Sequence, residues 1–194
     1  MRHNNIRDYE ASLLREVCRD VRVEPELLPL GNSGTRSRNK AEKARLDVSA
    51  VGIWSPMERT FLDVRVTNPN SASYLDKTID QVYNLHENEK KQMYNDRILH
   101  VEKGSFSPLI FTTTGGMGPE ATKYHKQIAQ LISAKRNETY SDVVNWIRTK
   151  VRFALLNSTL ISIRGERGKK RRGGDTPIAD ISLNLIPERS AYEV

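Results

Sequence analysis

Apolar residues recur along this chain in two rhythms, one with the period of an α-helix and one with the alternation of a β-strand. The helical spacing predicts helices over residues 5–21, 74–99, 120–136 and 140–164. Short apolar runs bounded by turn-forming residues predict strands within residues 21–31, 45–51, 61–66 and 108–113. A weaker alternation, IADISLNLI, predicts a late strand in residues 178–186.

These elements follow one another as helix, strand, loop, strand, strand, helix, strand, helix and helix. This order predicts a single α/β domain in which helices flank a central mixed β-sheet, with extra helices toward the C-terminal end. The sequence has no internal repeat. A basic, glycine-rich run near residues 165–174 is typical of a linker. We therefore expect one domain over residues 1–165 and a C-terminal extension over residues 166–194.

Each of the two central predicted strands has an aspartate inside an apolar run, in Leu46-Asp47-Val48 and in Leu62-Asp63-Val64. Aspartate has low β-propensity and its charge is costly to bury. A hairpin through residues 52–59 would bring Asp47 and Asp63 to one face of the sheet. Two close carboxylates repel unless a cation lies between them, and hard oxygen ligands favour magnesium or manganese. The pair alone leaves open that each aspartate simply faces solvent.

The predicted helix over residues 74–99 has a lysine within its apolar stripe. With Ile79 set at 0°, Lys90 lies at about 20°, whereas Lys91 falls on the polar face. An ammonium on the packed face needs a negative partner, for which the aspartate pair is a candidate; snorkelling along the apolar surface is the alternative. Glu10 also lies on an apolar face, of the first helix. It is either a third acidic group of the site or a favourable partner of the helix dipole.

Composition narrows the classes of function. The chain has 194 residues, of which 37% are hydrophobic and 28% charged. No apolar run approaches the roughly 18 residues of a membrane span, and the polar first residues are not a secretory signal. The single cysteine, Cys18, excludes an internal disulfide and a cysteine-built zinc site and suggests a reducing compartment. The net charge of +7, concentrated in residues 35–45 and 164–174, favours a polyanionic partner.

Four short motifs occur in the order and spacing of a known family. They are RHNNIRD at the start of the first helix, ARLDV and FLDVRV on the two aspartate strands, and KKQMY on the following helix. On these motifs residues 1–165 resemble the PD-(D/E)XK nuclease superfamily, and most closely the restriction-like endonuclease domain of site-specific non-LTR retrotransposons. In that group the catalytic lysine has moved from the third strand to the next helix, in a Lys-x-x-x-Tyr pattern that Lys90 and Tyr94 match.

The resemblance implies a restriction-endonuclease-like core and a set of site residues. Asp47, Asp63 and the carbonyl of Val64 would bind Mg²⁺ or Mn²⁺, which activates water for in-line attack on a phosphodiester. Lys90 would orient the water or neutralise the transition state, and Arg65 would hold a neighbouring phosphate. Arg65 replaces the family's lysine and cannot act as a base, because it stays protonated. The basic loop would follow the DNA backbone through Arg36, Arg38, Lys40, Lys43 and Arg45.

The expected function is therefore that of a metal-dependent DNA endonuclease that nicks target DNA for retroelement insertion. The partners it implies are DNA and a larger polyprotein with reverse transcriptase, and the expected location is intracellular, in the nucleus. An exonuclease, resolvase or repair nuclease of the same fold is an alternative. A catalytically decayed DNA-binding domain is another, favoured by Arg65 and opposed by the retention of both aspartates. The sequence specifies neither the target site nor the oligomeric state.

Overall fold

The computed structural model of the chain describes residues 2–30 and 36–168 as an α/β fold whose elements follow the predicted order. They are α1 (Arg2–Val17), β1 (Arg19–Val23), β2 (Val48–Val51), β3 (Arg59–Thr67), the 3₁₀ turn η1 (Ala72–Tyr74), α2 (Ile79–Arg97), the π-helical turn η2 (Ile98–Glu102), β4 (Ser105–Thr112), α3 (Pro119–Arg136) and α4 (Tyr140–Gly168).

The four strands form one mixed sheet in the order β1-β2-β3-β4. β2 and β3 are the predicted antiparallel hairpin, with Val48 opposite Leu62 and Val51 opposite Arg59. β4 runs parallel to β3, so the chain must cross over between them, and α2 makes that crossover. The sheet thus confirms a mixed α/β arrangement with both aspartate segments at its centre.

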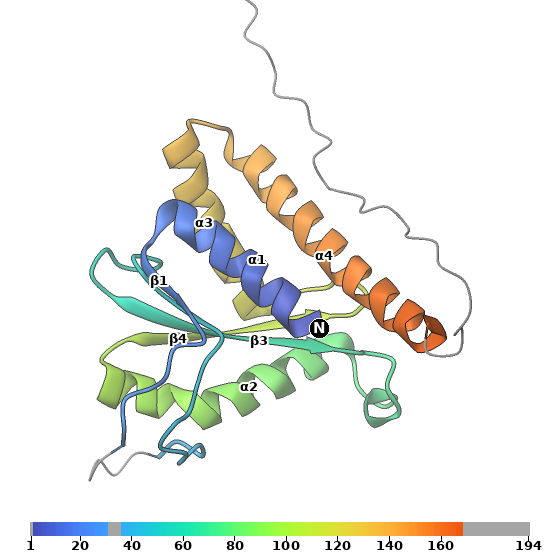
Figure 1. Cartoon of the computed structure of the whole chain (residues 1–194), viewed down its shortest axis with the longest axis horizontal. Coiled ribbons are helices and arrows are strands. Elements are labelled where there is room, and N and C mark those ends of the chain that lie inside the picture. The colour runs from blue at the N-terminus through green and yellow to red at the C-terminus, as the bar shows by residue number, and fades with distance from the viewer. Residues whose placement is uncertain (1, 31–35, 169–194) are drawn as a thin grey trace, which may run out of the picture.

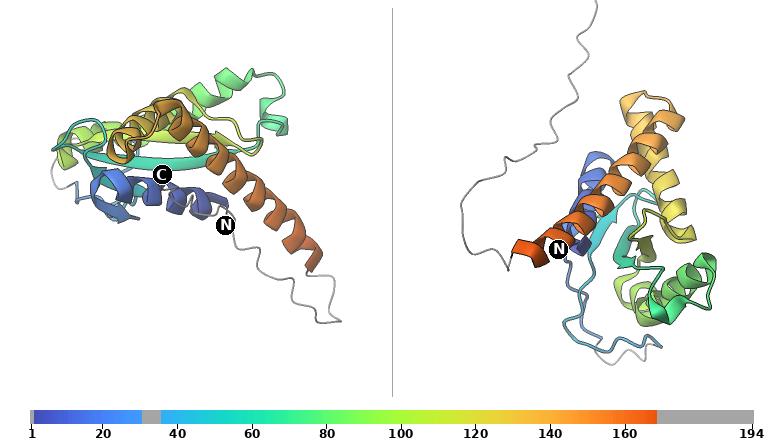
Figure 2. Two further views of the ribbon diagram at one scale, coloured as in Figure 1. Left: turned by 90° about the horizontal axis from the view of Figure 1, so that it is seen from above. Right: turned by 90° about the vertical axis from the view of Figure 1, so that its right-hand side faces the viewer.

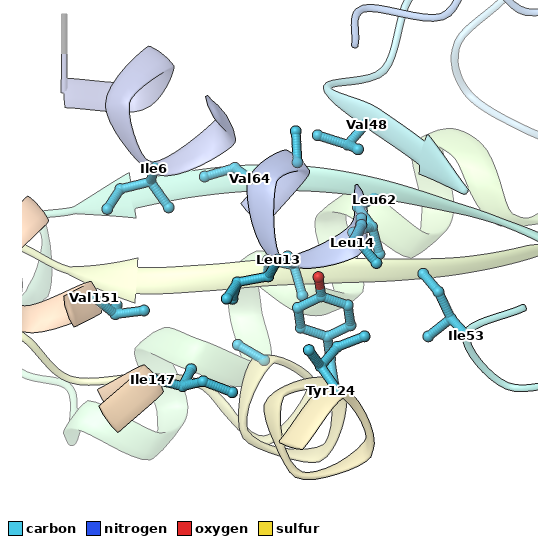
Figure 3. Packing of buried hydrophobic residues seen from close by; sticks show 14 of the residues in the cluster. Ile6, Leu13, Leu14, Val48, Ile53, Leu62, Val64, Tyr124, Ile147 and Val151 are labelled. Carbon is cyan, nitrogen blue, oxygen red and sulfur yellow. The ribbon is translucent and has the colours of Figure 1, made fainter. Parts of the chain in front are cut away.

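The helices divide between the two faces of the sheet. Figure 1 shows α1, α3 and α4 on one face and α2 on the other. The larger core lies under the three helices, where Leu62 and Val64 of β3 pack with Ile6 of α1 and Tyr124 of α3 (Figure 3). The smaller core lies between the sheet and α2, around Phe61. Alternate residues of β3 therefore face different helices, and Asp63 belongs to the side of α2.

Several predicted boundaries shift. The helix expected over residues 74–99 begins only at Ile79, because Thr78 and Gln81 form a capping box there. The first helix ends at Val17 and β1 starts at Arg19, where Asp20 has a φ of 44° and the pairing with β2 is irregular. The last helix continues to Gly168, beyond the predicted domain boundary at residue 165. The late strand predicted over residues 178–186 lies outside the described residues.

α4 is the longest of the described helices, and Figure 2 shows its C-terminal half extending beyond the rest of the fold. Val143, Ile147, Val151 and Leu155 bury one face of it against the larger core. Among residues 2–30 and 36–168, no helix combines the length and the apolar character that crossing a bilayer requires.

The basic loop between β1 and β2 is fastened to the end of α2 by a buried arginine. Arg97 is fully buried, and its guanidinium donates to the carbonyls of Leu28 and Ala41, each at 2.7 Å, and of Glu42 at 3.3 Å. Its backbone N–H donates to Ser37 Oγ at 2.8 Å. Planar, multiply donating arginine suits such a set of carbonyls better than lysine would. The described parts of the loop, residues 24–30 and 36–47, are therefore held beside the end of α2.

Candidate active site

The two aspartates lie next to each other across the hairpin. Asp47 directly precedes β2, one residue beyond the Val48–Leu62 pair, and Asp63 is in the middle of β3. The backbone N–H of Val64 donates to Asp47 Oδ2 at 2.6 Å, which draws that carboxylate across onto β3. The prediction that the hairpin brings these carboxylates together is thus supported by a direct contact between the two segments.

Lys90 reaches this pair from α2. Its Nζ lies 2.5 Å from Asp63 Oδ2, and the two side chains are only 18% and 10% exposed. The ammonium also lies 6.0 Å from the ring centroid of Tyr94, one turn further along the helix. The helical phase assigned from sequence therefore holds in the middle of α2, although Ile79 at its start is exposed. Lys90 thus points toward the sheet, as its helical phase predicts.

Asp47 is contacted by a histidine of α1, which was not among the predicted site residues. His3, in the first turn of α1, places Nε2 2.9 Å from Asp47 Oδ2. Because a carboxylate only accepts hydrogen bonds, the imidazole must donate from Nε2. Each aspartate thus contacts one side chain from a helix: Asp47 contacts His3 of α1, and Asp63 contacts Lys90 of α2.

Burial and charge set the protonation of the site. Burial raises the pKa of Asp63, and the charge of Asp47 raises it further. Lys90 and His3 oppose that shift because a nearby positive charge favours the ionised carboxylate. The hydrogen bond to Asp47 raises the pKa of His3, against a smaller opposing effect of burial. The four groups therefore act as one electrostatic unit.

Arg65 lies on the same face of β3 as Asp63 and belongs to a chain of polar contacts. Its Nη1 donates to Glu89 of α2 at 2.6 Å. Glu89 also lies 3.4 Å from His86 Nδ1, and His86 Nε2 lies 2.9 Å from the hydroxyl of Tyr74. Burial lowers the pKa of His86 and the charge of Arg65 lowers it further, whereas Glu89 opposes that shift. Arg65 is therefore held beside the aspartates, where its contact with a phosphate stays a prediction.

Glu10 is not part of this site, which corrects the interpretation of Glu10 as a third acidic group beside the aspartates. It is completely buried, and its Oε1 lies 2.9 Å from His125 Nε2 of α3. Burial raises the pKa of the Tyr124 hydroxyl, and the charge of Glu10 beside it raises that pKa further. His3, at the start of α1, reaches Asp47, whereas Glu10, about two turns later on the same helix, faces His125 of α3. Glu10 therefore stabilises the contact between α1 and α3 and does not extend the aspartate pair.

Lys91 points away from the aspartates, as the helical phase predicts. Its Nζ lies 2.5 Å from Glu120 at the start of α3, with side chains 39% and 27% exposed. The neighbouring Glu87 is buried and accepts the backbone N–H of Glu120 at 3.0 Å. The face of α2 that carries Lys91 thus packs near α3 and is less open to solvent than expected for a polar face.

The predicted DNA-binding residues all lie on the surface of the loop that Arg97 fastens. Figure 1 places this loop below the sheet, beside the C-terminal end of α2. The backbone N–H of Arg36 donates to Asp96 at 2.6 Å, and the Arg45 guanidinium pairs with Glu26. A DNA contact there stays a prediction. The exposed members are Arg36, Arg38, Lys40, Lys43 and Arg45.

The oxygen atoms of the aspartate pair suit a hard divalent cation. Within the described residues, no group of three or more His, Cys, Asp and Glu side chains is arranged to hold a metal. Mg²⁺, however, is commonly bound by one or two carboxylates and completes its shell with water. Among the described residues, His3 and the Val64 N–H contact Asp47 through Oδ2, and Lys90 contacts Asp63 through Oδ2. Carboxylate oxygens such as the two Oδ1 atoms are the ligands that Mg²⁺ and Mn²⁺ prefer, and binding of either ion here, with or without the Val64 carbonyl, stays a prediction.

Comparisons with known proteins add no relative. No protein-family model, curated protein or solved structure matches the chain. A function can therefore be inferred only from the chemistry of the site residues, which are Asp47, Asp63, Lys90 and Arg65.

Proposed function

We propose that this chain is a metal-dependent DNA endonuclease with a restriction-endonuclease-like core, acting to nick target DNA for retroelement insertion. One observation carries the proposal. The Lys90 ammonium, 18% exposed, lies 2.5 Å from the buried Asp63 carboxylate, and Asp47 accepts a hydrogen bond from the same strand, so three separate segments bring these side chains together. A largely buried lysine paired with a buried aspartate is costly to maintain for stability alone.

Each residue has a role that follows from its position. Asp47 and Asp63 would hold Mg²⁺ or Mn²⁺ through their Oδ1 atoms, and the cation supplies Lewis-acid stabilisation of a phosphodiester and lowers the pKa of water. Lys90 places a fixed positive charge where the pentacoordinate phosphorus builds up negative charge. Arg65, held by Glu89, offers its remaining N–H donors to a non-bridging phosphate oxygen.

The charge distribution supports a nucleic-acid substrate. The chain is basic, with a formal charge of +7, and the exposed loop fastened by Arg97 presents five cationic side chains. Such contacts position a phosphate backbone without reading its sequence. A polyanion that follows this loop toward β2 arrives at Asp47, which ends the loop.

A nicking assay on supercoiled plasmid tests the proposal. The wild-type chain with excess Mg²⁺ is expected to convert closed circles into open circles. EDTA should stop the reaction. A closed circle has no end, so an exonuclease would leave it intact while degrading linear DNA. No cleavage of either substrate, with DNA binding retained, would instead identify a decayed DNA-binding domain.

A further inference from the structure

The backbone around Asp47 is less regular than the backbone around Asp63. Asp63 is flanked on both sides by buried residues in the middle of β3, whereas Asp47 precedes β2 and sits at the end of the loop. Two donors compensate for this position. The Val64 N–H and the His3 imidazole both bind Oδ2, at 2.6 and 2.9 Å. Two donors on one oxygen fix the plane of the carboxylate and direct Oδ1 away from both of them.

His3 is itself held in place by the helix that carries it. Ile6, one turn later on the same side of α1, is completely buried in the larger core. The His3 side chain is 42% exposed, so its own packing contributes little to the fold. Its second ring nitrogen lies 3.4 Å from the Asn4 side chain, a long contact. The short contact to Asp47 is thus its principal interaction in the described structure.

We propose that His3 is a positioning residue that orients Asp47 toward the divalent cation. This inference rests on the proposed function and deepens it, because it adds α1 to a site otherwise built from two strands and α2. Without His3, the Val64 N–H alone would hold the carboxylate, which could then rotate about that single bond. Groups that hydrogen-bond a metal ligand commonly affect metal affinity or activity by about 10–100-fold.

Mn²⁺ binding to the protein without DNA tests the proposal independently of cleavage. The variants are His3→Ala, His3→Gln, whose amide nitrogen can replace Nε2 as a donor, and His100→Ala. His100 is an exposed histidine of η2 and serves as the matched control. Mn²⁺ affinity is measured by electron paramagnetic resonance, and stability by urea unfolding of the same samples. His3→Ala should weaken Mn²⁺ binding by about 10-fold or more, His3→Gln should restore most of the affinity, and His100→Ala should leave it unchanged.

Every other outcome counts against the role of His3, against the proposed function, or against both. Wild-type affinity in His3→Ala would overturn the proposal, as would a His3→Gln variant as defective as His3→Ala. Losses of Mn²⁺ affinity that follow losses of stability in both His3 variants would show a structural role only, and would also overturn it. A wild-type chain that binds Mn²⁺ and yet leaves DNA intact refutes the proposed function while the His3 effect on Mn²⁺ still stands. A wild-type chain that does not bind Mn²⁺ refutes both.

Discussion

Replacing Arg97 should loosen the basic loop and destabilise the whole domain. Arg97→Met keeps most of the buried volume but removes the donors to Leu28, Ala41 and Glu42. A hydrogen bond from a charged group contributes about 1.5–3 kcal/mol, and the two bonds at 2.7 Å are the strong ones. Two effects offset part of this loss. The variant no longer has to desolvate a guanidinium, and water can hydrate the carbonyls that lie near the surface. The expected loss is about 2–4 kcal/mol in the free energy of unfolding.

The matched control is Arg22→Met. Arg22 is 61% exposed and pairs with Asp20 on the surface, so its loss should leave the free energy of unfolding nearly unchanged. Urea unfolding measures both variants, and limited trypsin digestion reports whether cleavage after Arg38 becomes faster. Equal stability of the two variants, or an unchanged rate of loop cleavage in Arg97→Met, would refute the idea that Arg97 fastens the loop.

Three further predictions follow from the site and the loop. Asp63→Asn should abolish cleavage while DNA binding, measured by fluorescence anisotropy, survives or tightens, because it removes a metal ligand and a negative charge together; a variant that cuts normally would exclude the metal role. Lys90→Ala should lower the free energy of unfolding by about 3 kcal/mol, since it strands a buried carboxylate, against less than about 1 kcal/mol for Lys91→Ala. This loss of stability in Lys90→Ala should become smaller as the pH falls. The folded-state pKa of Asp63 is raised above its ordinary value of 3.8, so Asp63 takes up a proton as the pH approaches that pKa and its unpaired charge disappears. A loss that does not change with pH would contradict this reasoning. Arg38→Ala should weaken DNA binding and reduce its dependence on salt by about one counterion, without changing the rate at saturating DNA; an unchanged salt slope would place the DNA elsewhere.

The local periodicities of the sequence predict the elements that carry the site. Strand alternation places Asp63 on the opposite face of β3 from its neighbours Leu62 and Val64. Helical phase places Lys90 inward and Lys91 outward. Both inferences need only residues within one element or across one short hairpin. They hold because the apolar face of an element must be buried, which fixes the direction of every other side chain on it.

Contacts between distant segments are the part that the sequence does not reveal. The partner of Glu10 is His125, which is 115 residues away, so nothing near Glu10 in the sequence distinguishes a buried structural contact from a site residue. The bond from His3 to Asp47 spans 44 residues, and that from Arg65 to Glu89 spans 24. Arg97 looks like an ordinary cation at the end of a helix until the loop is folded onto it. These pairings depend on tertiary packing, which local patterns do not encode.

The most direct test of the central claim compares cleavage by Lys90→Ala and Lys91→Ala in single turnovers at saturating enzyme. The two variants have the same composition and net charge, and they differ only in which side of α2 loses its ammonium. Lys90→Ala should slow nicking of supercoiled DNA by about 10²–10³-fold, as the loss of one preorganised charge does, while Lys91→Ala should cut at nearly the wild-type rate. Equal rates in the two variants would contradict a catalytic role for the lysine that contacts Asp63.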